Sequence, residues 1–340
     1  ASRDKTVKLW NLQGKELHNL ATHQDEVRSI AFSPDGQTLA SASRDKTVKL
    51  WNLQGKELHS LAGHQGQVNS IAFSPDGETL ASASNDNTIK LWNLEGKELH
   101  SLTGHKNFVY SIEFSPDGKT LASASADQTV KLWNLEGQEL QSLAGHQSPV
   151  NSIAFSPDGQ TLASASDDQT VKLWNLEGQE LHSFTGHQGP VNSIVFSPDS
   201  KILASASTDQ TIKLWNLRGN EMYNFTGHED WVYSIAFSPD GETLASASAD
   251  KTIKLWNLQG EELHTLTGHQ GTVNGIAFSP DGETLASVSA DKTIKLWNLQ
   301  GKELQSFAGH QDEINSIAFS PDGETLASAS RDKTIKLWNL

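Results

Sequence analysis

The chain contains no cysteine, so its 340 residues offer neither a disulfide nor a thiolate metal ligand. No apolar run approaches the roughly 18 residues of a membrane-spanning helix. Basic residues are also scarce, with 26 against 41 acidic residues and a formal net charge of −15. This balance argues against nucleic acid and anionic membranes as partners, because both bind through basic patches. The lack of cysteine fits a reducing compartment, and we expect a cytoplasmic protein.

The sequence also lacks the signals that would mark a leader or a cofactor site. It has no secretory signal and no initiator methionine, and it opens inside a repeat, so we expect a fragment of a longer protein. It has no HExxH motif, no calcium loop and no glycine-rich phosphate loop. We therefore expect no metal and no cofactor.

What the chain does have is a 41-residue period. The dipeptide Trp-Asn recurs at this interval from Trp10 to Trp338 without insertion or deletion. A fixed period of this length indicates one supersecondary unit that is stacked or closed into an array. We expect a single domain spanning residues 1–340, with any specific chemistry located where the copies differ.

One unit shows four short segments with the alternation of β-strands. They cover residues 68–73, 79–84, 88–94 and 98–102, and turn residues separate them. The small residues of 79–84 suit an inner strand where neighbouring sheets converge, and the larger ones that follow suit strands further out. This gradient favours an all-β propeller over a flat solenoid.

Several residues of the unit then resemble the signature of the WD-repeat β-propeller family. Gly63-His64, a serine, Asp86 and Trp92 carry the resemblance, which extends over essentially the whole chain. The near-identity of the units is similar to that of bacterial highly repetitive WD-repeat proteins. One local departure is Ser200, which replaces the glycine of a Pro-Asp-Gly turn and should cost some strain.

The resemblance implies a hydrogen-bonded structural tetrad in each unit. In the second unit its members are His64, Ser84, Asp86 and Trp92, and in the first unit Ser41 and Ser43 both stay open as the serine. Histidine, serine and aspartate are also the residue types of a hydrolase triad. Eight identical copies make little sense as eight active sites, so we expect no catalytic residues and no enzyme.

Eight units from histidine to tryptophan predict a closed eight-bladed propeller with four antiparallel strands per blade. In the family, a repeat supplies three strands of one blade and the outer strand of the adjacent one. We therefore expect residues 15–21 to complete the last blade with residues 314–340. Residues 1–12 nearly copy 329–340, and we expect them to be a surplus strand. We expect a monomer, and a strand-swapped dimer is the alternative.

The tract after each Gly-His varies most, and the resemblance implies that it lies on the partner-binding rim. Units three and six carry Phe108 with Tyr110 and Trp231 with Tyr233, where most other units have asparagine at the second position. Aromatic side chains dominate binding hot spots, so these four are candidate anchors for a protein or peptide. Packing against a neighbouring blade, or plugging of the channel mouth, is an equally open interpretation.

The rim of the first and last units also gathers charge. Four carboxylates are expected on one arc, namely those of Asp25, Glu26, Asp312 and Glu313. Three arginines lie nearby in the sequence pattern, namely Arg28, Arg44 and Arg331. We favour a self-neutralising network over a docking patch for a charged partner.

Two further series recur without a predicted function. Five histidines fall on predicted outer strands, namely His18, His59, His100, His182 and His264. Glutamine or tyrosine replaces them in other units, so solvated strand positions are favoured over metal ligands. The lysine before each Leu-Trp, such as Lys90, is likewise expected to be solvated.

Three functions remain to be compared. The favoured one is a non-enzymatic protein–protein interaction scaffold or sensor propeller, which the resemblance connects with signalling ATPases or kinases. The second is a recently amplified or engineered repetitive propeller with no evolved partner. The third is a small-ligand or sugar site at the channel mouth, built from Asn69, Tyr110, Asn151 and Tyr233.

Overall fold

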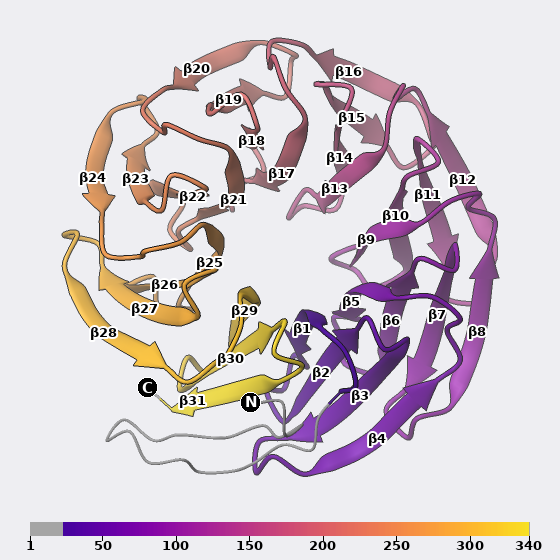
Figure 1. Ribbon diagram of the computed structural model, residues 1–340. Helices are drawn as coiled ribbons and strands as arrows, with labels where there is room; N and C mark the ends of the chain where they lie inside the picture. Colours follow the sequence, from indigo (N-terminus) through magenta and orange to yellow (C-terminus); the bar gives the residue numbers. More distant parts are fainter. Residues whose placement is uncertain (1–22, 340) are drawn as a thin grey trace.

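The computed structural model describes residues 23–339, and in this range the chain forms eight antiparallel sheets arranged like spokes around a central axis (Figure 1). Seven sheets have four strands in chain order, and the eighth has three strands within the described residues. This range contains no helix that could cross a membrane. The protein is therefore an all-β, eight-bladed propeller, as the sequence predicts.

The second blade shows how the sequence forms each sheet. From the axis outward it holds β5 (Val68–Phe73), β6 (Thr79–Ser84), β7 (Thr88–Asn93) and β8 (Glu98–Thr103). The predicted bounds are confirmed for β5 and β6, whereas β7 ends one residue earlier and β8 continues one residue further. Because each strand pairs with the next one in sequence, short turns are sufficient connections.

The other blades repeat this order. Blade 1 holds β1 (Val27–Phe32), β2 (Thr38–Ser43), β3 (Thr47–Asn52) and β4 (Glu57–Ala62). Blade 3 holds β9 (Val109–Phe114), β10 (Thr120–Ser125), β11 (Thr129–Asn134) and β12 (Glu139–Ala144). Blade 4 holds β13 (Val150–Phe155), β14 (Thr161–Ser166), β15 (Val171–Asn175) and β16 (Glu180–Phe184). Blade 5 holds β17 (Val191–Phe196), β18 (Ile202–Ser207), β19 (Ile212–Asn216) and β20 (Glu221–Phe225). Blade 6 holds β21 (Val232–Phe237), β22 (Thr243–Ser248), β23 (Ile253–Asn257) and β24 (Glu262–Leu266). Blade 7 holds β25 (Val273–Phe278), β26 (Thr284–Ser289), β27 (Thr293–Asn298) and β28 (Glu303–Ala308). Blade 8 holds β29 (Ile314–Phe319), β30 (Thr325–Ser330) and β31 (Ile335–Asn339).

The core lies between blades rather than within them. Ala81 and Ala83 of β6 pack against Ile112 and Trp133 of the next blade, and equivalent clusters fill the other interfaces. The small residues therefore belong to the second strand and not to the innermost one. Their small size makes room for the large side chains of the neighbour, and burying each such side chain contributes about 1.5–3 kcal/mol.

The ring closes through the same kind of interface. Val27 of β1 packs with Ala327 and Leu337 of blade 8, and Asn315 Nδ2 donates to Val27 O at 3.0 Å. Blades 1 and 8 lie side by side in Figure 1. The predictions that residues 15–21 complete the last blade and that residues 1–12 form a surplus strand concern segments outside the described residues, as does His18.

The Pro-Asp-Gly turns connect the first and second strands of each blade. Gly77 has a φ of 75°, and an added Cβ would lie 3.4 Å from the Pro34 ring of the preceding blade. Ser200 replaces the glycine of the equivalent turn and has a φ of 60°, a backbone conformation that is unfavourable for residues with a side chain. Its hydroxyl accepts a hydrogen bond from the Asp158 backbone N–H at 3.0 Å across the interface, which offsets part of that strain.

Candidate binding site at the channel mouth

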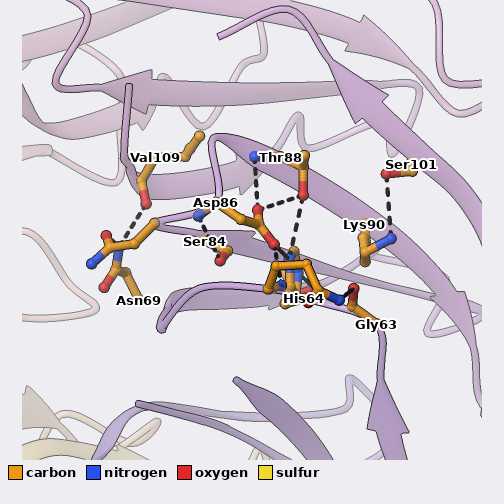
Figure 2. A network of polar contacts seen from close by, with 12 residues as sticks. Gly63, His64, Asn69, Ser84, Asp86, Thr88, Lys90, Ser101 and Val109 are labelled. Carbon is orange, nitrogen blue, oxygen red and sulfur yellow. Dashed lines mark hydrogen bonds and ion pairs between the residues drawn. The ribbon is translucent and has the colours of Figure 1, made fainter. Parts of the chain in front are cut away.

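Each described blade contains a buried chain of hydrogen bonds. In the second blade Trp92 Nε1 donates to Ser82 Oγ at 2.8 Å, and Ser82 Oγ lies 2.8 Å from His64 Nε2. His64 Nδ1 lies 2.9 Å from the Asp86 carboxylate, which also accepts from Thr88 Oγ1 at 2.6 Å (Figure 2). A carboxylate can only accept, so Nδ1 carries the proton and Nε2 accepts from the serine.

The serine of this tetrad is Ser82, so the assignment to Ser84 was wrong. Trp92 pairs with Leu80 on the neighbouring strand, and its indole N–H reaches the next residue on the same face, which is Ser82. Ser84 lies two residues further, about 6.6 Å along the strand. Its hydroxyl instead accepts from the Asp86 backbone N–H at 3.1 Å and fixes the turn.

The tetrad geometry is structural. Burial by itself would raise the pKa of Asp86, but the hydrogen bonds from His64 and Thr88 outweigh it and hold that pKa well below its usual range. Both ring nitrogens of His64 and the hydroxyl of Ser82 are already bonded within the blade. In blade 8 burial lowers the pKa of His310 to about 4. These groups orient one another within the blade.

The repeated lysine is buried, so the expectation of a solvated position was wrong. Lys90 is 8% exposed, and its Nζ bonds Glu98 at 2.9 Å and Ser101 at 3.3 Å. The ammonium also lies 6.0 Å from the Trp92 ring centroid. The same pair, eight residues apart, recurs at Lys49–Glu57, Lys131–Glu139, Lys172–Glu180, Lys213–Glu221, Lys254–Glu262 and Lys295–Glu303.

A second repeated contact joins neighbouring blades near the axis, and we call it the asparagine clasp. Asn69 Nδ2 donates to Val109 O of the next blade at 2.8 Å and to Asn85 Oδ1 at 2.7 Å (Figure 2). The clasp recurs as Asn151 to Val191 O, Asn192 to Val232 O, Asn274 to Ile314 O and Asn315 to Val27 O. Sequence reasoning missed this contact: it offered Asn69 and Asn151 only as members of a small-ligand site and gave the other asparagines no role.

Three blades interrupt the clasp. Arg28, Tyr110 and Tyr233 take the asparagine position of blades 1, 3 and 6, and among the described residues none of them bonds the next blade's carbonyl in this way. All three line one hollow of about 590 Å³. Because its lining comes from the innermost strands and loops of six blades, this hollow lies at the mouth of the central channel. Its remaining lining is Gln67, Asn69, Asn85, Phe108, Asn274 and Asn315.

The predicted aromatic anchors therefore lie in or beside this mouth. Phe108 is 42% exposed and Trp231 is 49% exposed, while Tyr110 and Tyr233 are half-buried. Trp231 and Tyr233 meet edge to face, with ring centroids 6.2 Å apart. The structure thus brings Phe108 and both tyrosines together around the hollow, whereas Asn151 is not part of its lining.

Most carboxylates of the charged arc of blades 1 and 8 lie close to an arginine. Arg28 Nη2 lies 3.1 Å from Glu26 Oε2, and Arg44 Nη1 lies 3.5 Å from Glu26 Oε1. Arg331 Nη1 lies 2.8 Å from Glu313 Oε2. Asp25 lies 4.0 Å from Arg44, and Asp312 Oδ1 accepts from the Glu313 backbone N–H at 2.9 Å.

The outer histidines form no metal site in the part of the chain that is described. His59, His100, His182 and His264 lie on the outermost strands of their blades. No group of three or more histidines, aspartates or glutamates in residues 23–339 is placed to hold a metal ion.

One ionisable residue on an innermost strand escaped the sequence reasoning. Glu113 lies on β9, where the other seven blades have alanine or valine. Its Oε2 accepts from the Phe155 backbone N–H of the next blade at 3.1 Å. Burial raises the pKa of Glu113 to about 8. The only sequence signal was a carboxylate in place of a small apolar residue.

Comparison with known families agrees with this architecture. The family described as WD domain, G-beta repeat, matches residues 14–52, 55–93, 96–134, 137–175 and 178–216, which together exceed half of the chain. The family described as IFT122 first beta-propeller matches residues 209–339. No curated protein matches the chain significantly.

Proposed function

The chain belongs to the WD40-repeat family, and from this premise we propose that it is a non-enzymatic platform that binds a protein or peptide across the channel mouth. Propellers of this family generally serve as non-catalytic scaffolds. The finer assignment, to this mouth and to its aromatic residues, is the proposal.

One observation carries the proposal. The tyrosines that break the asparagine clasp are the same tyrosines that line the hollow, and each has an exposed aromatic residue two positions before it. Replacing the clasp gives up an inter-blade hydrogen bond worth about 1 kcal/mol. If Tyr110 and Tyr233 bind a partner, the binding free energy compensates for the lost hydrogen bond. This explains why blades 3 and 6 both depart from the repeat at the same position.

A peptide-display library tests the proposal. The baits are the wild type, a rim variant with Phe108, Tyr110, Trp231 and Tyr233 changed to alanine, and a control variant. The control has four exposed leucines of the outermost strands changed to alanine, namely Leu58, Leu140, Leu181 and Leu263. We expect peptides that the wild type and the control enrich and the rim variant does not.

Other outcomes would favour the other readings. Equal enrichment by all three proteins would mean that the aromatic residues only pack. Enrichment by none would favour an amplified or engineered propeller without an evolved partner. A thermal shift with sugars that the rim variant loses would favour a small-ligand site.

A further inference from the structure

Trp231 differs from every other described tryptophan. The eight tryptophans of the repeated Trp-Asn series in residues 23–339 are no more than 2% exposed, whereas Trp231 is 49% exposed. The loop residue opposite it is Ala249, whose backbone N–H donates to Trp231 O at 2.8 Å. Because Ala249 has only a methyl side chain, this residue cannot cover the indole ring.

Two carboxylates precede this ring. Glu229 and Asp230 are both exposed, and Asp230 Oδ1 accepts from the Trp231 backbone N–H at 2.8 Å, which fixes the carboxylate against the Trp231 backbone. Burial, and after it the negative charge of Asp230, raise the pKa of the Tyr233 phenol. Asp230 therefore acts electrostatically on the aromatic pair that borders the hollow.

Asp230 lacks the arginine partner that its equivalent has in blade 1. In blade 1 the facing loop position is Arg44, whose Nε lies 4.0 Å from Oδ2 of Asp25, the residue equivalent to Asp230. In blade 6 that position is Ala249. Within residues 23–339 no lysine or arginine forms an ion pair with Glu229 or Asp230, including the exposed lysine at position 251 of the same blade.

An exposed indole with two unpaired carboxylates is suited to a cation. A cation over an indole face gains about 0.5–2 kcal/mol. A guanidinium adds bidentate pairing with a carboxylate and stacks on an aromatic plane, which an ammonium does not. On the blade 3 side of the hollow, Lys106 stands two residues before Phe108 and would repel a second cation.

We infer that the blade 6 side of the channel mouth holds a cationic side chain of a peptide partner, arginine in preference to lysine, between Trp231 and the carboxylates of Glu229 and Asp230. This inference rests on the proposed function and specifies its partner. The bound segment is oriented, with its cation toward blade 6 and uncharged or acidic residues toward Phe108 of blade 3. The phenol groups of Tyr110 and Tyr233, which line the mouth, can hydrogen-bond its backbone.

Fixed-centre peptide pools test the inference. Five pools of blocked heptapeptides have random flanks and arginine, lysine, glutamine, leucine or glutamate at the centre. We expect the immobilised protein to retain the arginine pool about tenfold more than the glutamine pool, with lysine between them. Binding should also shield Trp231 from iodide quenching, because it is the exposed tryptophan of the described residues.

Charge variants separate the cation site from general stickiness. Glu229→Gln with Asp230→Asn keeps the acceptor for the Trp231 N–H but removes both charges, and should abolish the preference for arginine. Asp167→Asn is the matched control, because Asp167 is an exposed rim carboxylate of blade 4 that accepts from Asn151 Nδ2 at 2.7 Å. It should leave the preference unchanged.

The outcomes distinguish this inference from the proposed function. Equal retention of the arginine and glutamine pools, or an arginine preference that survives the double charge variant, would overturn the inference. If neutral pools are retained by wild type and lost by the rim variant, the platform stands and the cation site does not. Shielding of Trp231 by acetyl-arginine amide as strong as that by the arginine pool would overturn the peptide as occupant.

Discussion

Inside the second blade both ring nitrogens of His64 are hydrogen-bonded, whereas at the channel mouth Glu229 and Asp230 have no ion-pair partner in the described range. The first region repeats almost unchanged in eight blades, and the second differs from blade to blade. The histidine, serine and aspartate, which are residue types typical of catalysis, thus lie where their polar atoms are already hydrogen-bonded to one another. The repeated interior stabilises the fold, and under the proposed function binding takes place where the repeats differ.

The largest expected effect comes from breaking the interior. His146→Ala leaves Ser164 and Asp168 without their shared partner in a buried setting. We expect a loss of about 2–4 kcal/mol in the free energy of unfolding, measured by urea denaturation. His100→Ala on the exposed outer strand should cost about 0.5 kcal/mol or less. Equal losses at the two histidines would contradict the structural role of the tetrad.

The buried lysines give the next effect. Glu180→Gln removes the partner that lies 2.8 Å from Lys172 Nζ and leaves a poorly hydrated ammonium. We expect a loss of about 1–2 kcal/mol, below the full cost of a broken buried pair because Glu180 is partly exposed. Adding Lys172→Met should recover most of it in a double-mutant cycle. A double variant no more stable than Glu180→Gln would show that the charge is not the cause.

Glu113 should give the interior interface between blades 3 and 4 a pH dependence. Its folded pKa of about 8 lies above the unfolded value, so its contribution is complete below about pH 4 and is lost as the pH rises through 8. The difference in free energy of unfolding between Glu113→Gln and wild type should therefore shift in favour of the variant by at least about 1.4 kcal/mol between pH 5 and pH 9. A constant difference from wild type at both pH values would contradict this pKa.

The smallest effect sharpens the comparison at the mouth itself. Tyr110→Asn and Tyr233→Asn should restore the asparagine clasp and raise the free energy of unfolding by up to about 1 kcal/mol. The same change should reduce peptide retention, so stability and binding move in opposite directions. Asn192→Tyr is the reverse control, because it removes the bond to Val232 O and should destabilise. A double variant that is less stable than wild type would show that the tyrosines pack better than the clasp.

Much of the fold could be predicted from one repeat. Alternation, turn residues and the fixed period determined the strands β5 and β6 and the number of blades. The tetrad histidine, aspartate and tryptophan followed from the resemblance. The assignment to Ser84 instead of Ser82 was wrong because both serines lie on one face of the strand, and only the pairing register shows which hydroxyl the indole reaches.

The remaining misses share a physical cause. Lys90 occupied a polar position in an alternating pattern, and only the adjacent outer strand reveals that Glu98 covers it. Asn69 acts on a carbonyl 40 residues away, in another copy of the same repeat. Glu113 resembled a chance substitution until its neighbour across the interface was known. Each depends on a contact between strands that local sequence does not specify.

The last joint of the ring, where Asn315 bonds Val27 O, is made like the joint where Asn69 bonds Val109 O. No single interface between blades determines how many blades the ring has. Each interface sets only the angle between two neighbouring blades, and the number of blades is the number of copies that together complete a full turn. A chain with one unit more would have to turn through a smaller angle at each interface, so the number of copies sets how far neighbouring blades open.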